Sequence, residues 1–186
     1  MVKKVSCPQL SLCLAAKQYL IKSAVFIWKR AQILVAETWA AFFPPMPIIT
    51  HPIFPGPAGP AIQHLTMFAD YRVPQILHHL RILTYPPSFI HKLQTRMPLA
   101  PGSKEEISVR AASIIAVEKV REAIIKMREG EPQPEDVNGS GHEVSSVLID
   151  FCLWDLAKKL EDGKQKIEGI KTAEMVPMHR TRSIWY

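Results

Sequence analysis

The chain has 186 residues, of which 47% are hydrophobic and 22% are charged, and these values suit one globular domain with a sizeable core. Its formal net charge of +6 is compatible with a nucleic-acid or phosphate ligand, but the basic residues are scattered, which favours a mildly basic cytosolic protein. Three irregularly spaced cysteines exclude a disulfide framework and a CxxC metal site, and no uncharged apolar run of about 18 residues predicts a membrane span. We therefore expect a cytoplasmic protein without a membrane partner.

The first part of the chain divides into a helical and an irregular stretch. From Leu10 to Phe43 there is neither proline nor glycine, which predicts one long helix or two abutting helices. Between Pro44 and Pro60 lie seven prolines, two glycines and no charged side chain, and this composition cannot hold a helix. We expect residues 44–63 to form a disordered, proline-rich insertion.

Three further helices are expected after this insertion. Apolar residues recur at helical spacing before Pro86 and predict a helix that ends near it; they are Ile76, Leu77, Leu80 and Leu83. Ser103 and Glu106 have the capping-box spacing, which predicts the start of a helix that runs towards Glu129.

The last part of the chain reads as a loop over 130–141, followed by a helix from Val144 to about Glu161. No alternating pattern typical of strands occurs. The predicted fold class is all-α, in a single domain over residues 1–186.

The segment around Asp70 carries the first candidate for chemistry. It places one carboxylate between two aromatic residues, Phe68 and Tyr71, shortly before Pro74, which suits a first helical turn. A carboxylate there feels the positive end of the helix dipole and tends to stay ionised. Such a charge suits an enzyme that handles a flat base and a developing positive charge, although a plain helix N-cap explains the same aspartate.

The second candidate is the helix that contains Asp150, Trp154 and Asp155, which is apolar on nearly every side and therefore expected to be buried. Asp150 and Trp154 are one turn apart and share a face. Asp155 is expected to project into an apolar stripe made by Val144, Val147, Leu148 and Phe151. Each aspartate either serves a ligand or pairs with an arginine or a helix end, because an unpaired buried charge is costly.

Other candidates depend on single residues. Lys29 interrupts an apolar helical stretch, so it is either a tuned buried acid or base or a surface lysine whose stem snorkels. Arg180 and Arg182, next to His179, either hold a phosphate or belong to a solvated basic tail. His78 and its neighbour lack a matching ligand set, so no metal site is expected.

Five blocks follow one another along the chain: KRAQILVA at 29–36, FADYRVPQ at 68–75, EISVRAAS at 106–113, LIDFCLWD at 148–155 and HRTRSIWY at 179–186. In their residues and in their order along the chain they resemble the queuosine salvage proteins, the queuosine 5′-phosphate N-glycosylase family. The resemblance extends from Phe26 to Tyr186 except for the proline-rich stretch.

The resemblance implies a helical fold related to the helix-hairpin-helix DNA glycosylases. It implies hydrolysis of the N-glycosidic bond of queuosine 5′-monophosphate, which frees queuine for tRNA, with no metal or organic cofactor and no direct tRNA binding. Carried over by position, Asp70 is the nucleophile or transition-state stabiliser. The implied ligand-binding residues are Phe68, Asp150 and Trp154, with Tyr71 and Asp155 nearby.

The chain departs from the family pattern before the Phe26 block. Family members have a longer N-terminal region that also lines the pocket, so we expect an incomplete domain that has lost part of the pocket wall and is impaired as an enzyme. Two alternatives stay open: an inactive truncated homologue, and a helical nucleic-acid-binding module suggested by the basic charge. The module predicts steep salt dependence of nucleic-acid affinity, whereas the enzyme should bind mononucleotide.

Overall fold

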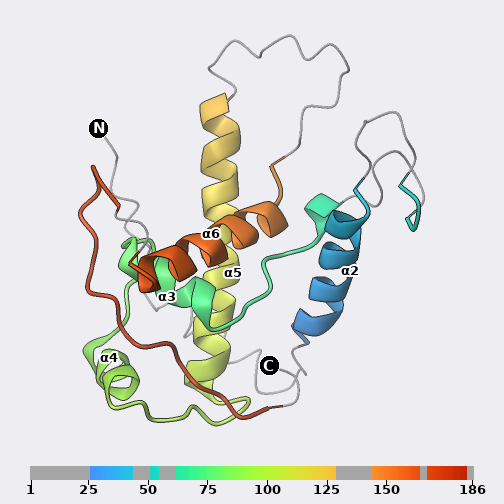
Figure 1. Cartoon of the computed structure of the whole chain (residues 1–186). Coiled ribbons are helices and arrows are strands. Elements are labelled where there is room, and N and C mark those ends of the chain that lie inside the picture. Colours follow the sequence, from blue (N-terminus) through green and yellow to red (C-terminus); the bar gives the residue numbers. More distant parts are fainter. Residues whose placement is uncertain (1–25, 44–50, 55–61, 129–143, 164–166, 184–186) are drawn as a thin grey trace.

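The computed structural model describes residues 26–43, 51–54, 62–128, 144–163 and 167–183 (Figure 1). These residues contain five α-helices and a 3₁₀ turn, and no β pairing beyond an isolated parallel bridge between Leu99 and Thr181. The predicted all-α class is confirmed, whereas the relation to helix-hairpin-helix glycosylases and the single domain over 1–186 stay predictions. The elements are α2 (Lys29–Ala41), η1 (Ile62–His64), α3 (Arg72–His79), α4 (Pro87–Gln94), α5 (Lys104–Arg128) and α6 (Ser146–Glu161).

The first described helix covers part of the stretch that the sequence predicts to be helical. Helix α2 begins at Lys29, because Trp28 has a left-handed backbone (φ 53°) that a helix cannot continue through. Residues 10–25 of the predicted helix and most of the predicted insertion at 44–63 lie outside the described residues. Within that insertion, residues 52–54 form a bend, and the buried His51 ring accepts N–H bonds from Ile53 and Phe54.

Helix α3 ends at His79, so the prediction that it reaches Pro86 is wrong. Arg81 is left-handed (φ 60°), and the N–H groups of Ile82 and Leu83 turn back to the carbonyl of Leu77 at 2.9 and 3.1 Å. Leu83 therefore meets the core from a turn, not from a helix. After the turn, α4 begins with a proline at its first position.

The starts of α5 and α6 confirm the predicted helix signals. Ser103 Oγ accepts the N–H of Glu106 at 3.3 Å, and the Glu106 carboxylate accepts the N–H of Gly102 at 3.2 Å. At α6, Ser145 Oγ accepts the N–H of Leu148 at 3.3 Å. The capping box at the start of α5 is the one that the sequence predicts, whereas the Ser145 cap of α6 was not predicted.

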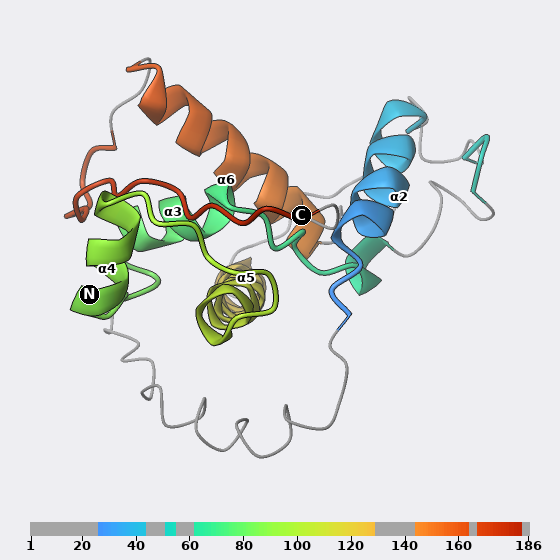
Figure 2. The same ribbon diagram turned by 90° about the horizontal axis from the view of Figure 1, so that it is seen from below.

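The main core lies where α3, α5 and α6 meet. Figure 2 looks nearly along α5, with α3 and α6 together on one side of it and α2 next to the start of α6. Buried side chains from the segment before α3 and from these three helices fill the contact: Met67, Ala69, Val73, Leu77, Ala116, Val117 and Ile149. The segment that leads to Asp70 thus passes through the centre of the core.

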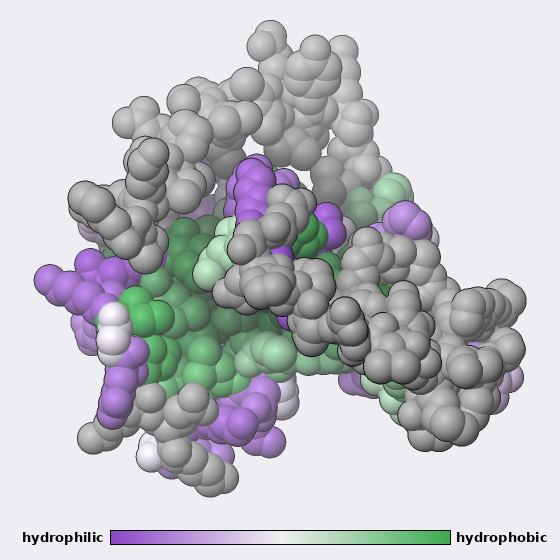
Figure 3. Space-filling view, turned by 90° about the horizontal axis from the view of Figure 1, so that it is seen from above, coloured by the Kyte–Doolittle hydropathy of each residue, from purple (hydrophilic) through white to green (hydrophobic). Residues whose placement is uncertain are grey.

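Two smaller clusters extend the core on either side. The first joins α4 to α5 and to the C-terminal segment, and its buried residues are Tyr85, Phe89, Leu93, Leu99, Val109 and Val176. Ala36, Ile62, Phe68 and Val147 join α2 and η1 to the start of α6. Seen from above, apolar side chains also gather on the outer surface between polar edges (Figure 3).

Candidate active site

Asp70 lies in front of α3, where its side chain caps the helix. Its Oδ1 accepts the N–H groups of Arg72 and Val73, both at 2.9 Å, and the residue is 8% exposed. The helix N-terminus favours the ionised form, as the sequence suggested, but burial outweighs it. Burial raises the pKa of Asp70, while the N–H of Val73 and the charge of Lys29 oppose this change.

Asp150 comes from α6 and lies beside Asp70, although the two residues are far apart in the sequence. Its Oδ2 accepts the N–H of Phe68 at 2.9 Å, and the residue is 2% exposed. Burial is the main cause that raises the pKa of Asp150 to about 7, and the negative charge of Asp70 acts in the same direction. The two acids therefore form one electrostatically coupled pair in the core.

Lys29, the first residue of α2, supplies a positive charge to this pair. Its charge lowers the pKa values of Asp70 and Asp150, and burial lowers the pKa of Lys29 itself. Its Nζ also lies 5.8 Å from the centre of the Tyr71 ring. Lys29 is therefore half-buried and close to the acids, and its role as an acid or base or as a snorkelling lysine stays a prediction.

The predicted aromatic residues surround the acids to different extents. Phe68 is buried and packs edge-on against Phe151, with ring centres 5.7 Å apart. Tyr71 and Trp154 are 39% and 38% exposed, so both can meet a ligand. The Arg72 guanidinium lies over the Trp154 ring, 5.3 Å from its centre, in a cation–π contact.

Asp155 lies outside the cluster, and the expectation that it projects into an apolar stripe is wrong. Its side chain is 56% exposed and forms an ion pair with Lys159 at 2.6 Å. Five residues after Asp150 in a helix, it points about 140° away from that residue. Helix α6 is accordingly not buried all round, because Cys152, Trp154 and Asp155 are exposed.

The C-terminal segment is bound to the body of the molecule. Gln75 Nε2 donates to the carbonyl of Val176 at 2.8 Å, and the Leu99 N–H donates to that of Arg180 at 2.7 Å. The Arg180 and Arg182 side chains are exposed, and Arg180 lines a hollow of about 310 Å³ together with Arg96 and Glu161. Neither acid of the coupled pair lines this hollow.

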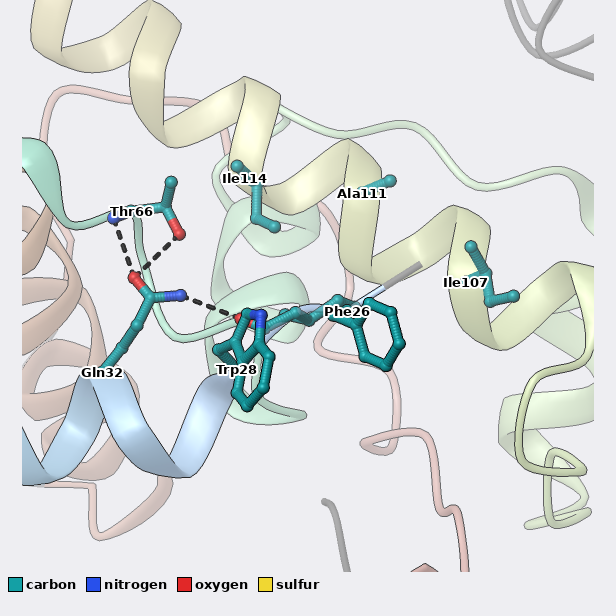
Figure 4. A pocket seen from close by; sticks show the side chains of 8 residues that line it. Phe26, Trp28, Gln32, Thr66, Ile107, Ala111 and Ile114 are labelled. Atoms are coloured by element: carbon teal, nitrogen blue, oxygen red, sulfur yellow. Dashed lines mark hydrogen bonds between the residues drawn. The ribbon is translucent and has the colours of Figure 1, made fainter. Parts of the chain in front are cut away.

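A second hollow, of about 290 Å³, lies between the start of α2 and the face of α5 (Figure 4). Most of its lining is apolar: Phe26, Ile27, Trp28, Ile107, Ala111 and Ile114. Gln32 donates to the Ile27 carbonyl at 2.9 Å, and its Oε1 accepts the N–H of Thr66 at 2.9 Å. Gln32 thereby ties α2 to the segment that leads to Asp70.

Two residues that the sequence analysis did not assign to the site belong to it, Arg110 and Glu106. Arg110 of α5 donates from Nε to the carbonyl of Ala69 at 3.0 Å and pairs with Glu106 at 2.8 Å. Both charged residues are less than a tenth exposed. Their spacing of four residues within a helix was the available signal, because it allows a buried ion pair.

His179 also lies at this site, since burial and the charges of Arg110 and Lys29 lower its pKa to about 4. It is 4% exposed, so it belongs to the interior and not to a solvated basic tail. His78, the other histidine considered, is stacked on Tyr85 with ring centres 4.4 Å apart. Among the described residues no group of three or more acidic, histidine or cysteine side chains could hold a metal ion.

A family model described as queuosine salvage protein matches residues 15–186. The chain belongs to the queuosine salvage protein family. Relatives named queuosine 5′-phosphate N-glycosylase/hydrolase are 36% identical over 166 residues in Mus musculus, 35% over 165 in Sphaerobacter thermophilus and 38% over 161 in Schizosaccharomyces pombe. Each alignment covers 87% of this chain but only 41%, 40% and 40% of the relative. This queuosine salvage family member thus spans about two fifths of the length of the curated relatives it matches. None of the helices described in it is both long and apolar enough to cross a membrane.

Proposed function

We propose that this chain carries the catalytic acid and base-binding residues of a hydrolase for the N-glycosidic bond of queuosine 5′-monophosphate. The released queuine would then be available for insertion into tRNA. Support comes from the names of the relatives and from the coupled pair Asp70 and Asp150, two buried acids brought together from distant segments. The substrate would be a free nucleotide, with no tRNA contact, metal or organic cofactor required.

Asp70 is assigned to the sugar. Breaking an N-glycosidic bond passes through a state with positive charge on the anomeric carbon and ring oxygen, which a carboxylate stabilises or traps. Oδ1 of Asp70 is oriented by two backbone N–H groups, so we assign Oδ2 to face the anomeric carbon. A carboxylate held by backbone donors needs little rearrangement during the reaction.

Asp150 is assigned to the base. Queuine has carbon where guanine has N7, so protonation at that position cannot assist its departure. Recognition of the N1–H and the exocyclic amine must therefore contribute more to catalysis. An ionised carboxylate accepts hydrogen bonds from both donors. Asp150 keeps capacity for these bonds, because the Phe68 N–H engages one of its oxygens.

Phe68, Tyr71 and Trp154 are assigned to the faces of the base. Base–aromatic stacking contributes about 1–3 kcal/mol per base, which suits the flat 7-deazaguanine ring. Stacking on Trp154 requires a covering cation, Arg72 or Lys158, to move aside from its ring. Phe68 contributes through its edge, since it is buried against Phe151.

The remaining assignments concern charged residues at the edges of the site. Lys29 is assigned to substrate binding because its charge acts on both acids. Arg180 and Arg182 are assigned to the 5′-phosphate as exposed cations near the buried His179. Asp155 would have to leave Lys159 before it could bind substrate.

The direct test is to incubate the purified chain with queuosine 5′-phosphate and to detect free queuine by mass spectrometry. We expect queuine to form with the wild-type chain and not with the Asp70→Asn variant. Tryptophan fluorescence should change with the mononucleotide and not with duplex DNA. Absence of queuine together with tight, salt-dependent duplex binding would replace the hydrolase by a nucleic-acid-binding module.

A further inference from the structure

The short segment Phe68–Asp70 is held by two helices from opposite ends. Asp150 of α6 accepts the N–H of Phe68 at 2.9 Å, and Arg110 of α5 donates to the carbonyl of Ala69 at 3.0 Å. The carbonyl of Ala69 belongs to the peptide group that enters Asp70. Rotation of this peptide would turn the Asp70 side chain, so the Arg110 bond bears directly on its direction.

The backbone at Ala69 needs this support. Ala69 is fully buried and has a left-handed backbone with φ 48°, a conformation that non-glycine residues rarely adopt. Such a residue keeps its conformation only when its surroundings hold it in place. The Arg110 guanidinium supplies a charged donor on the carbonyl side of this residue.

Arg110 is itself fixed by a second ion. Its Nη1 pairs with Glu106 Oε1 at 2.8 Å, one turn earlier on α5. The other oxygen of Glu106, Oε2, accepts the N–H of Gly102 at 3.2 Å, just before the helix begins. A rigid guanidinium with several donors can satisfy Glu106 and Ala69 together, whereas a lysine ammonium is a single mobile charge.

We propose that Arg110 is a positioning residue for Asp70: held by Glu106, it locks the Ala69 carbonyl and thereby aims the Asp70 carboxylate at the sugar. This inference rests on the proposed hydrolase function. It assigns Arg110 no contact with substrate. It predicts that loss of Arg110 lowers kcat while substrate binding, which depends on Asp150 and the aromatic residues, changes little.

The test compares Arg110→Ala, Arg110→Lys and the control Arg121→Ala in steady-state cleavage of queuosine 5′-phosphate. Arg121 lies on the same helix and pairs with Glu118 at 3.0 Å. It therefore matches Arg110 as a helical arginine paired with a glutamate, but it lies at another position on the helix. We expect Arg110→Ala to lower kcat about 100-fold, as for a misplaced reacting group, with KM nearly unchanged. Millimolar methylguanidine should restore part of kcat in Arg110→Ala, and Arg121→Ala should match the wild type.

An unchanged kcat in Arg110→Ala, or a loss that appears in KM alone, would overturn the proposal. So would a kcat loss without any rescue by methylguanidine, because a general loss of structure gives that result. If Arg110→Ala fails to fold, Glu106→Gln serves instead: it keeps the shape of the side chain, weakens its hold on Arg110 and should lower kcat by a smaller factor.

A readout without substrate separates this inference from the proposed function. In Arg110→Lys, the backbone NMR shifts of Ala69 and Asp70 should move, while those of the distant end of α6 stay in place. Unmoved shifts refute the positioning role whatever the activity. If the wild-type chain releases no queuine but these shifts move, the hydrolase proposal fails and the structural role of Arg110 stands.

Discussion

Replacing Asp150 by asparagine removes a buried titrating group and keeps a carbonyl oxygen that can accept the Phe68 N–H. Burial raises the pKa of this carboxyl from 3.8 to about 7 in the folded protein. Between those pH values the folded state holds a proton that the unfolded state has released. The contribution of Asp150 to stability is therefore full below pH 4 and is lost as the pH rises to 7.

The size of this loss follows from the pKa change, which corresponds to about 4 kcal/mol in the free energy of unfolding. Asp150→Asn should therefore match the wild type near pH 4 and exceed its stability by up to about 4 kcal/mol at pH 8. Asp70 and Lys29 face Asp150, and the charge of Lys29 also acts on His179. All three are present in both proteins, so the comparison isolates Asp150 to a first approximation.

Urea denaturation at pH 5, 6, 7 and 8 measures this difference, with circular dichroism as the signal. Asp155→Asn is the matched control, because Asp155 lies on the same helix but is exposed and paired with Lys159. An exposed pair of this kind contributes less than about 1 kcal/mol, and the control difference should not grow between pH 5 and 8. A constant difference between Asp150→Asn and the wild type over that range would refute the burial argument.

Three further predictions concern the site and the helix that carries it. Asp70→Asn keeps the oxygen that caps α3, so the protein should stay folded while kcat falls at least about 100-fold; retention of a tenth of the activity would remove Asp70 from the chemistry. Trp154→Ala should raise KM roughly 5- to 100-fold through lost stacking, with partial recovery in Trp154→Phe, and an unchanged KM would exclude the stacking role. Ser145→Ala removes the N-cap of α6 and should lower the free energy of unfolding by about 1 kcal/mol in urea titrations; equal stability would mean that the bond to Leu148 contributes nothing.

The helices show how much of the fold can be predicted from local sequence signals. The capping signal at Ser103 and the apolar spacing after Val144 predicted α5 and α6 nearly to the residue, because caps and periodicity act within a few residues. The predicted end of α3 was wrong because Leu83 has the right spacing but meets the core from a turn. Apolar spacing records which side chains are buried, and a turn can bury the same side chain as a helix.

The chain's own sequence determined the all-α class and the starts of the two long helices. It also identified Asp70, Asp150 and Asp155 as candidate site residues. Tertiary structure alone decided that Asp70 and Asp150 form a coupled pair, that Asp155 faces solvent and that Arg110 grips the peptide before Asp70. The physical reason is distance along the chain. Helix caps and apolar periodicity depend on residues that are near one another in the sequence. The burial of a carboxyl group, and with it the pKa of that group, depends on which remote helices pack over the residue.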